Sequence, residues 1–246
     1  MNLTKDIWTF ISKFLCFVDQ MALKRVCKKT SRIKLDFKKI ILDRLSRHID
    51  NPKEFCDQLV YCRAVISGSF IIACLYDTND YKDIDVFDQQ TNRDVSAFSN
   101  YLWKHRKYEY TAHIYDNVYM IRNFIVKETT IENVIVYIDP IKYINATFDM
   151  DICKSYFDGN KLIVKSWDKL IQRRDFIKPN GLLMTYYSGD FNVYQLSIKR
   201  MAKYINRGFD ITFHPKYEDI VKYVESSVED RCFKQTAKVF VDLSQF

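Results

Sequence analysis

The sequence predicts an α+β fold, in which helices flank a small mixed sheet and a short helical unit precedes the sheet. Three observations lead to this expectation. Helical apolar spacing fills the first 48 residues, short apolar strands alternate with helices in the middle of the chain, and helical signals return near its end. Asn51-Pro52 marks the boundary, so we expect a helical module over residues 1–50 and a larger domain with C-terminal helices over residues 51–246.

Three helices are expected before this boundary. Thr4 can cap the first, whose apolar residues fall at i, i+4, i+7 and i+8, and Asp19 can cap the second. A third helix is expected over residues 35–45. Large apolar side chains such as Trp8 and Phe10 exceed what so small a unit can bury, which indicates a partner.

A Gly-Ser turn at a helix start is followed, fourteen positions after the serine, by an acid-apolar-acid strand. Gly68 lets the backbone approach an anion closely, and Ser69 can cap the helix and donate to a phosphate. Asp83 and Asp85 share one face of the strand, and Ile84 points to the core between them. Two adjacent carboxylates repel unless a cation joins them, and such oxygen ligands suit Mg²⁺ or Mn²⁺. Each motif alone is common, but together they predict a phosphate beside a divalent metal.

The remaining elements follow from periodicity and turn chemistry. We expect helices over residues 53–64, 70–75, 94–105, 140–146 and 192–206, and strands over residues 81–88, 117–126, 133–138 and 148–157. A polar Lys-Glu-Thr-Thr segment before residue 133 suits a hairpin loop. Gly208 is expected to stop the long helix as a left-handed cap, and two more helices are expected from Pro215 onward.

The composition is that of a folded globular chain. Of the 246 residues, 48% are apolar and 28% charged, and no apolar run approaches the length of a membrane span. No cationic segment followed by an apolar core begins the chain, so we expect an intracellular protein. Seven cysteines without a Cys-x-x-Cys pair and four histidines at no ligand spacing argue against zinc sites and disulfides.

The order helix, Gly-Ser turn, helix, Asp-x-Asp strand, helix and hairpin resembles the nucleotidyltransferase superfamily of DNA polymerase β and poly(A) polymerases. Three further motifs, Phe-Asp-Met-Asp-Ile-Cys from residue 148, Tyr-Phe-Asp-Gly from residue 156 and Arg-x-x-Lys-Tyr-x-x-Arg-Gly-Phe from residue 200, look like a group found in giant DNA viruses and fungi. The resemblance implies a nucleoside triphosphate substrate and two metal ions held by Asp83 and Asp85. It also implies a third carboxylate on a neighbouring strand.

The third carboxylate departs from the superfamily pattern, because the strand expected over residues 133–138 carries no central acid. Asp151, on the next expected strand, is the first candidate, and Asp149 and Asp139 follow it. We therefore assign metal binding and catalysis to Asp151 together with the two aspartates of the acid-apolar-acid strand.

Two basic clusters suggest contacts with phosphate. Lys199, Arg200 and Lys203 crowd one side of the helix expected over residues 192–206, where they would bind the triphosphate or the acceptor backbone, or else form a solvated basic face. A second cluster offers a nucleic-acid contact or, more commonly for such runs, a solvated helix face. Its members are Lys24, Arg25, Lys28, Lys29, Arg32, Lys34, Lys38 and Lys39.

Residues 3–32 resemble an F-box, a three-helix module that docks on the Skp1 adaptor of cullin ubiquitin ligases. The Val-Cys-Lys tripeptide at residues 26–28 is the most specific part, and Thr4 stands where the family usually has proline. The alternative is a helical extension packed on the main domain. An F-box-like module joined to such a domain implies a large DNA virus of eukaryotes and action in the host cytoplasm. A non-catalytic adaptor that recruits targets to a ubiquitin ligase is therefore the alternative to an enzyme.

Overall fold

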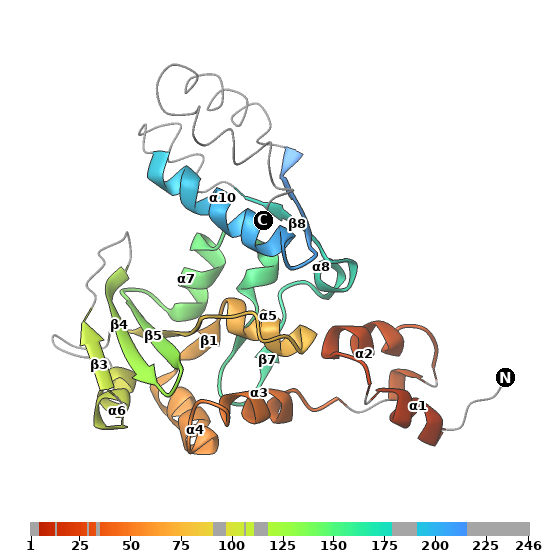
Figure 1. The fold of residues 1–246 in the computed structure, drawn as a ribbon, viewed down its shortest axis with the longest axis horizontal. Helices are drawn as coiled ribbons and strands as arrows, with labels where there is room; N and C mark the ends of the chain where they lie inside the picture. The colour runs from red at the N-terminus through yellow and green to blue at the C-terminus, as the bar shows by residue number, and fades with distance from the viewer. Residues whose placement is uncertain are drawn as a thin grey trace. The chain divides into compact units, whose positions relative to one another are not determined.

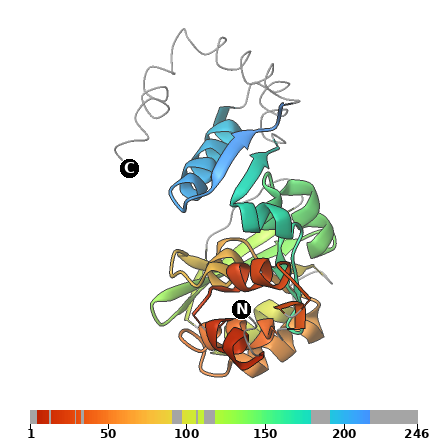
Figure 2. The ribbon, with the colours of Figure 1, turned by 90° about the vertical axis from the view of Figure 1, so that its right-hand side faces the viewer.

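The computed structural model describes residues 5–12, 14–28, 30–32, 35–90, 97–105, 107–110, 118–178 and 191–215 (Figure 1, Figure 2). The chain forms two compact units. The first comprises Met1–Phe148 and Ile152–Ile171, and the second comprises Asp149–Asp151 and Gln172–Phe246. The helices expected from Pro215 onward lie outside the described residues.

Several helices of the first unit begin where the sequence supplies a cap. Asp36, Asn51 and Asp139 each accept a hydrogen bond from the amide three residues further on, at the starts of α3, α4 and α7. A proline also occupies the first turn of α4 and of α7. The helices are α1 (Lys5–Ser12), α2 (Phe17–Lys24), α3 (Phe37–Leu45), α4 (Pro52–Cys62), α5 (Ser69–Tyr76), α6 (Ala97–His105), α7 (Pro140–Thr147) and α8 (Trp167–Gln172).

A mixed sheet forms the centre of the first unit. In the described residues it has seven strands in the order β3-β4-β5-β2-β1-β6-β7. Only β2 and β5 pair in parallel, and the other neighbouring strands are antiparallel. The strands are β1 (Val65–Ser67), β2 (Asp83–Gln89), β3 (Lys107–Tyr110), β4 (Val118–Val126), β5 (Thr129–Val136), β6 (Tyr156–Phe157) and β7 (Leu162–Ile163). The predicted α+β class with a mixed sheet flanked by helices is therefore confirmed.

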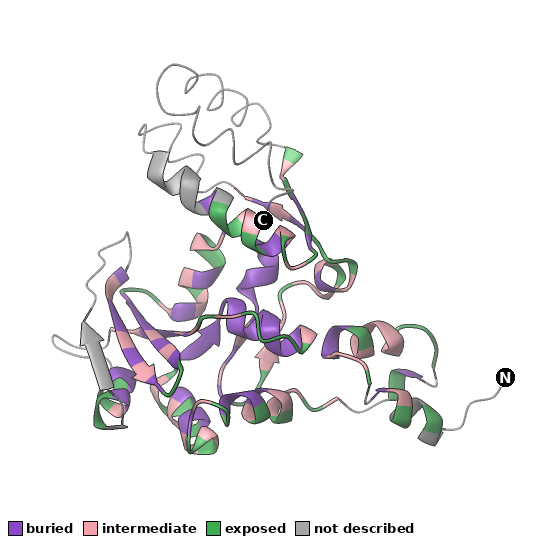
Figure 3. Cartoon of the chain, in the orientation of Figure 1, coloured by how far each residue is buried: buried purple, intermediate pink, exposed green. Residues whose placement is uncertain are grey.

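Both faces of this sheet are covered by helices, which places the core along its centre (Figure 3). On one face, Ile144 of α7 packs in a cluster with Phe87 and Val134 of the sheet. On the other face, Asp88 of β2 accepts a hydrogen bond from the Phe98 amide of α6 at 3.3 Å. Helix α5, which follows β1, is buried over its first seven residues. The strand and helix that carry the Gly-Ser turn are thus held rigidly inside the core.

The second unit contains strands β8 (Arg174–Ile177) and β9 (Asp210–Phe213), which pair in parallel, and helix α10 (Phe191–Ile205). Gly208 follows α10 with a φ of +80°, as expected for its left-handed cap. The buried carboxylate of Asp149 accepts hydrogen bonds from Ser197 and Arg200, both at 3.1 Å. These contacts attach the short segment that includes Asp149 to α10.

Two expectations about strands are wrong. The strand expected over residues 148–157 is instead a 3₁₀ turn over Asp151–Lys154 followed by the short strand β6. Strand β5 begins at Thr129, four residues before the expected start at residue 133. The left-handed conformation of Lys127, with a φ of +53°, reverses the chain so tightly that Val126 pairs directly with Thr129. Two of the four residues in the polar segment expected to be a loop, Thr129 and Thr130, are therefore strand.

The amino-terminal helices show what the first 50 residues contribute. Helices α3 and α4 lie on either side of Asn51 and belong to the same compact unit. Phe17 of α2, Phe37 of α3 and Trp167 of α8 form a ring cluster with centroids 3.7–6.0 Å apart. A separate module over residues 1–50 stays a prediction.

Among the helices of the described residues, none has both the length and the apolar character needed to cross a bilayer.

Candidate functional site

Three carboxylates meet on one face of the sheet. Asp83 and Asp85 alternate along β2 with Ile84, which is fully buried on the opposite face. Glu132 of β5 is the direct neighbour of Asp85 in the parallel pairing. One oxygen from each of Asp83, Asp85 and Glu132 lies within 4.8 Å of the other two, and all three side chains are half-buried. Carboxylates this close repel one another, so the arrangement favours a bound cation.

The Gly-Ser turn lies directly beside this group. Ser67 pairs with Asp85 across β1 and β2, and Gly68 follows with a φ of +77° and a ψ of −149°. A β-carbon at residue 68 would come within 2.3 Å of Asp85 Oδ2. Ser69 is buried at the first position of α5, whose first-turn amide groups favour an anion. Only glycine allows both this backbone conformation and this approach of the turn to the carboxylate.

The donor set fits a hard divalent ion. All three groups offer carboxylate oxygens, which are ligands that Mg²⁺ and Mn²⁺ prefer, and none offers sulfur or imidazole. Half-burial leaves room for a substrate oxygen or water to complete an octahedral shell. The geometry of the carboxylates and of the Gly-Ser turn is therefore consistent with the expected acidic metal site beside a phosphate.

The structure brings together four of the residues expected at the site, namely Asp83, Asp85, Gly68 and Ser69. Asp151 is not among the carboxylates grouped with the two aspartates, and it belongs to the second unit. There it forms an ion pair with Lys178, whose Nζ is 2.9 and 3.0 Å from its two carboxylate oxygens. Glu132 is the third carboxylate of the group that the described residues form. Strand β5 begins before residue 133 and includes Glu132, so the expected strand without a central acid is wrong.

The basic residues expected to bind the nucleotide lie on α10 in the second unit. Lys199, Arg200 and Lys203 are exposed there. Arg200 also donates to the buried carboxylate of Asp149, so it has a structural role in addition to any ligand contact. A role for the three in phosphate binding stays a prediction.

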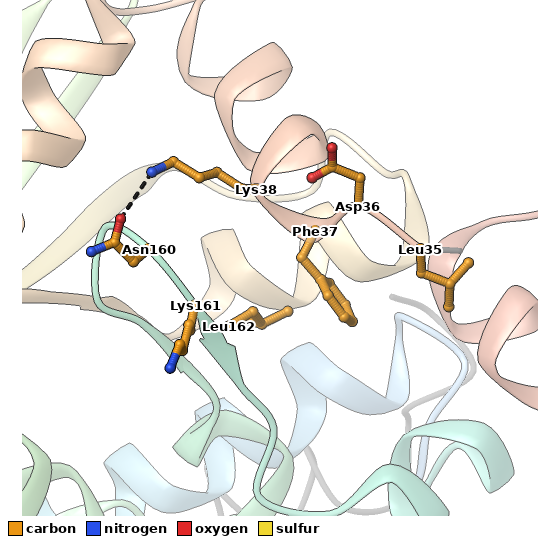
Figure 4. A pocket seen from close by; sticks show the side chains of 7 residues that line it. All are labelled: Leu35, Asp36, Phe37, Lys38, Asn160, Lys161 and Leu162. Carbon is orange, nitrogen blue, oxygen red and sulfur yellow. Dashed lines mark hydrogen bonds between the residues drawn. The ribbon is translucent and has the colours of Figure 1, made fainter. Parts of the chain in front are cut away.

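A separate hollow of about 560 Å³ lies between the start of α3 and the turn before β7 (Figure 4). Lys38 Nζ donates to Asn160 Oδ1 at 3.0 Å across it. None of its lining residues belongs to the acidic group. They are Leu35, Asp36, Phe37, Lys38, Asn160, Lys161 and Leu162.

Three thiols in the first unit are poor nucleophiles. Burial raises the pKa of Cys56 and of Cys62 to about 11 and that of Cys74 to about 12. Since the thiolate is the reactive form, these side chains are protonated and unreactive near neutral pH.

The fold is similar to that of a solved nucleotidyltransferase. A structure described as a CCA-adding enzyme with CTP superposes with a TM-score of 0.53 at 15% sequence identity. The alignment covers 78% of this chain and 45% of that enzyme, so the chain spans less than half of the enzyme's length. At this identity the likeness shows a shared fold. No curated protein matches the chain.

A family match covers the sheet and the site. Residues 35–178 match the family described as "Gabija anti-defense 2 family protein". This span includes the Gly-Ser turn and all three site carboxylates, but not residues 3–32, where the F-box-like pattern lies. Because the match extends over more than half of the 246 residues, the chain belongs to the Gabija anti-defense 2 family.

Proposed function

We propose that the protein is a metal-dependent nucleotidyltransferase, which moves a nucleoside monophosphate from a nucleoside triphosphate to a hydroxyl group. The observation that carries this proposal is the convergence of Asp83, Asp85 and Glu132 beside the Gly68-Ser69 turn. The hydroxyl belongs to a nucleic acid, a protein or a small molecule. The family name leads us to propose that the transfer counters the Gabija defence, within the cytoplasm of the host cell.

The proposed reaction is a single in-line displacement. The acceptor oxygen forms a bond to the α-phosphorus, the bond from that phosphorus to the bridging oxygen breaks, and pyrophosphate leaves with the electron pair. The hydroxyl proton passes to a carboxylate of the site or to water. A divalent ion bound at the site would neutralise charge on the phosphates and favour the deprotonated acceptor.

The residues of this chain have separate roles in the proposal. Asp83, Asp85 and Glu132 would hold Mg²⁺ or Mn²⁺, and Glu132 replaces Asp151 as the proposed third ligand. Gly68 would allow the triphosphate to approach the backbone, and Ser69 would donate to it together with the first amides of α5. Lys199, Arg200 and Lys203 remain our candidates for further phosphate contacts, as cations that neutralise the triphosphate.

Transfer of label tests the proposal directly. Purified protein is incubated with each α-³²P nucleoside triphosphate, Mn²⁺ or Mg²⁺, and panels of RNA, protein and small-molecule acceptors. We expect label on at least one acceptor, and we expect none with the Asp83→Asn, Asp85→Asn double variant, which keeps the shape of the site but removes two of its three carboxylates. The Asp175→Asn variant controls for removal of a buried aspartate elsewhere. Transfer that survives in the double variant would show that the acidic group is not the catalytic site.

A second candidate function rests on apolar side chains exposed on the amino-terminal helices. Phe10 of α1 is 60% exposed, Phe14 is 74% exposed, and their rings meet at a centroid distance of 5.0 Å. Ile7 on the same helix is 40% exposed. Exposed aromatic pairs of this kind favour a protein partner. We propose Skp1 as that partner on the strength of the F-box-like pattern, and an adaptor function would need no chemistry at the acidic group.

Binding of purified Skp1 separates this adaptor function from the enzyme. Burying one such ring stabilises a complex by about 1.5–3 kcal/mol, so Phe10→Ala with Phe14→Ala should weaken binding by well over tenfold. Tyr61→Ala is the matched control, since Tyr61 is 80% exposed on α4 and should not affect binding. Surface plasmon resonance measures each affinity. No binding by the wild type, or equal binding by the double variant, excludes the adaptor function.

A further inference from the structure

A buried arginine lies beneath the turn that leads into the acidic strand. Arg44 of α3 is 2% exposed. Its guanidinium donates to the Thr78 carbonyl, to Asn79 Oδ1 at 3.2 Å and to Asp77 Oδ1 at 2.8 Å. These three acceptors belong to successive residues of one turn, whose side chains are otherwise exposed. One buried cation therefore fixes the turn through both backbone and side chains.

Arg44 and His48, which lies three residues beyond the end of α3, also contact the last part of this turn. The Arg44 guanidinium lies 5.9 Å from the centroid of the Tyr81 ring, and the Tyr81 hydroxyl is 2.6 Å from His48 Nε2. Burial lowers the pKa of His48 and raises that of Tyr81, so this hydrogen bond joins two neutral groups near pH 7. The Tyr81 ring packs edge-on against Phe70 at 5.1 Å. Tyr81 is thus held from three sides.

The position of these contacts in the chain connects the two motifs of the site. Phe70 directly follows Ser69, and Tyr81 precedes Asp83 by two residues. The turn over residues 77–82 is the connection between α5 and β2. A shift of this turn would move the start of β2, and with it Asp83, relative to the Gly-Ser turn. The distances between phosphate-binding and metal-binding groups therefore depend on the turn's position.

We propose that Arg44 is a positioning residue, which sets Asp83 and Asp85 for metal binding by holding the turn over residues 77–82. This inference rests on the proposed function of the acidic group. Arg44 touches neither metal nor substrate in this scheme, and it acts through the backbone that leads into β2. Removal of a buried arginine from α3 should consequently change metal affinity as well as stability.

Metal affinity, measured by titration calorimetry with Mn²⁺ alone on the whole 246-residue chain, tests the inference. Arg44→Met keeps much of the side-chain volume but removes every hydrogen bond, and we expect its affinity for Mn²⁺ to fall about tenfold or more, as for other groups that orient metal ligands. Arg44→Lys should recover part of the affinity, because it keeps the charge but not the fork of donors. Leu45→Val, a fully buried neighbour on α3, should lower stability and leave the affinity unchanged.

A gentler double variant keeps the test decisive if Arg44→Met does not fold. Asp77→Asn removes the charge of one partner of Arg44, and Asn79→Ala removes the Oδ1 acceptor of another, both at exposed positions. The double variant should weaken Mn²⁺ binding in the same direction. Thermal unfolding identifies the folded variants. If the wild type binds Mn²⁺ and these variants bind it equally well, the positioning role is wrong while the proposed function stands. If the wild type binds no Mn²⁺ at all, the proposed function fails and the positioning role fails with it.

Discussion

Glu132→Gln should lower the rate of nucleotidyl transfer by about a hundredfold or more. The expected size follows from the several kcal/mol by which a correctly held metal ion stabilises a phosphoryl-transfer transition state, since each ~1.4 kcal/mol changes the rate tenfold. Glu132 is paired in register with Asp85, so the substitution removes one of the three converging carboxylates without altering the strand. Initial rates of label transfer at saturating Mn²⁺ and triphosphate measure the effect.

Asp151→Asn is the matched comparison for this change. Both variants convert one carboxylate to an amide, but Asp151 pairs with Lys178 in the second unit. We expect Asp151→Asn to lower the unfolding temperature and to keep the rate of transfer at saturating metal. Loss of transfer in Asp151→Asn with a normal rate in Glu132→Gln would reverse the assignment of the third ligand.

Gly68→Ala should remove both metal binding and transfer, and should also destabilise the protein. The backbone at residue 68 is in a region open essentially to glycine, so alanine there costs about 1–3 kcal/mol of unfolding free energy. The new β-carbon would also meet Asp85 Oδ2 at 2.3 Å, which forces this carboxylate out of its position in the acidic group. Calorimetric titration with Mn²⁺ and chemical denaturation measure the two effects separately.

Gly208→Ala separates backbone strain from damage to the site. Gly208 also has a positive φ, of +80°, and a β-carbon there would meet only Arg173 at 3.3 Å. This variant should therefore lose stability and keep its affinity for Mn²⁺. If Gly68→Ala binds Mn²⁺ as tightly as Gly208→Ala does, the turn does not constrain the acidic group.

The sequence predicts those residues of the candidate site that belong to local motifs. Gly68-Ser69 and the two β2 aspartates are recognisable because turn chemistry and two-residue alternation are local properties. Glu132 is not recognisable in the same way, since its role arises from parallel pairing with a strand 47 residues earlier. A tight turn through Lys127 lacks the usual Asn-Gly or Asp-Gly signal, so strand β5 is expected to begin too late and its acid is missed.

Asp149 and Asp151 illustrate the opposite error. Their two-residue spacing resembles that of Asp83 and Asp85 and suggests a second acidic strand. In the structure their side chains instead meet donors far along the chain, Ser197 and Arg200 for Asp149 and Lys178 for Asp151. Long-range ion pairs of this kind leave no periodic signal, so sequence spacing alone cannot separate a metal ligand from a structural carboxylate.

The chain enters the second unit at Asp149, returns to the first at Ile152 and enters the second again at Gln172, which limits how the protein can be divided into fragments. No single cut releases either unit whole, because Asp149–Asp151 belong to the second unit while Ile152–Ile171 return to the first. A fragment ending at residue 148 would lack β6 and the edge strand β7 of the sheet. A fragment ending at residue 171 would leave the buried Asp149 carboxylate without Ser197 and Arg200. When genes of related proteins recombine, the segments that encode the two units should therefore be exchanged together.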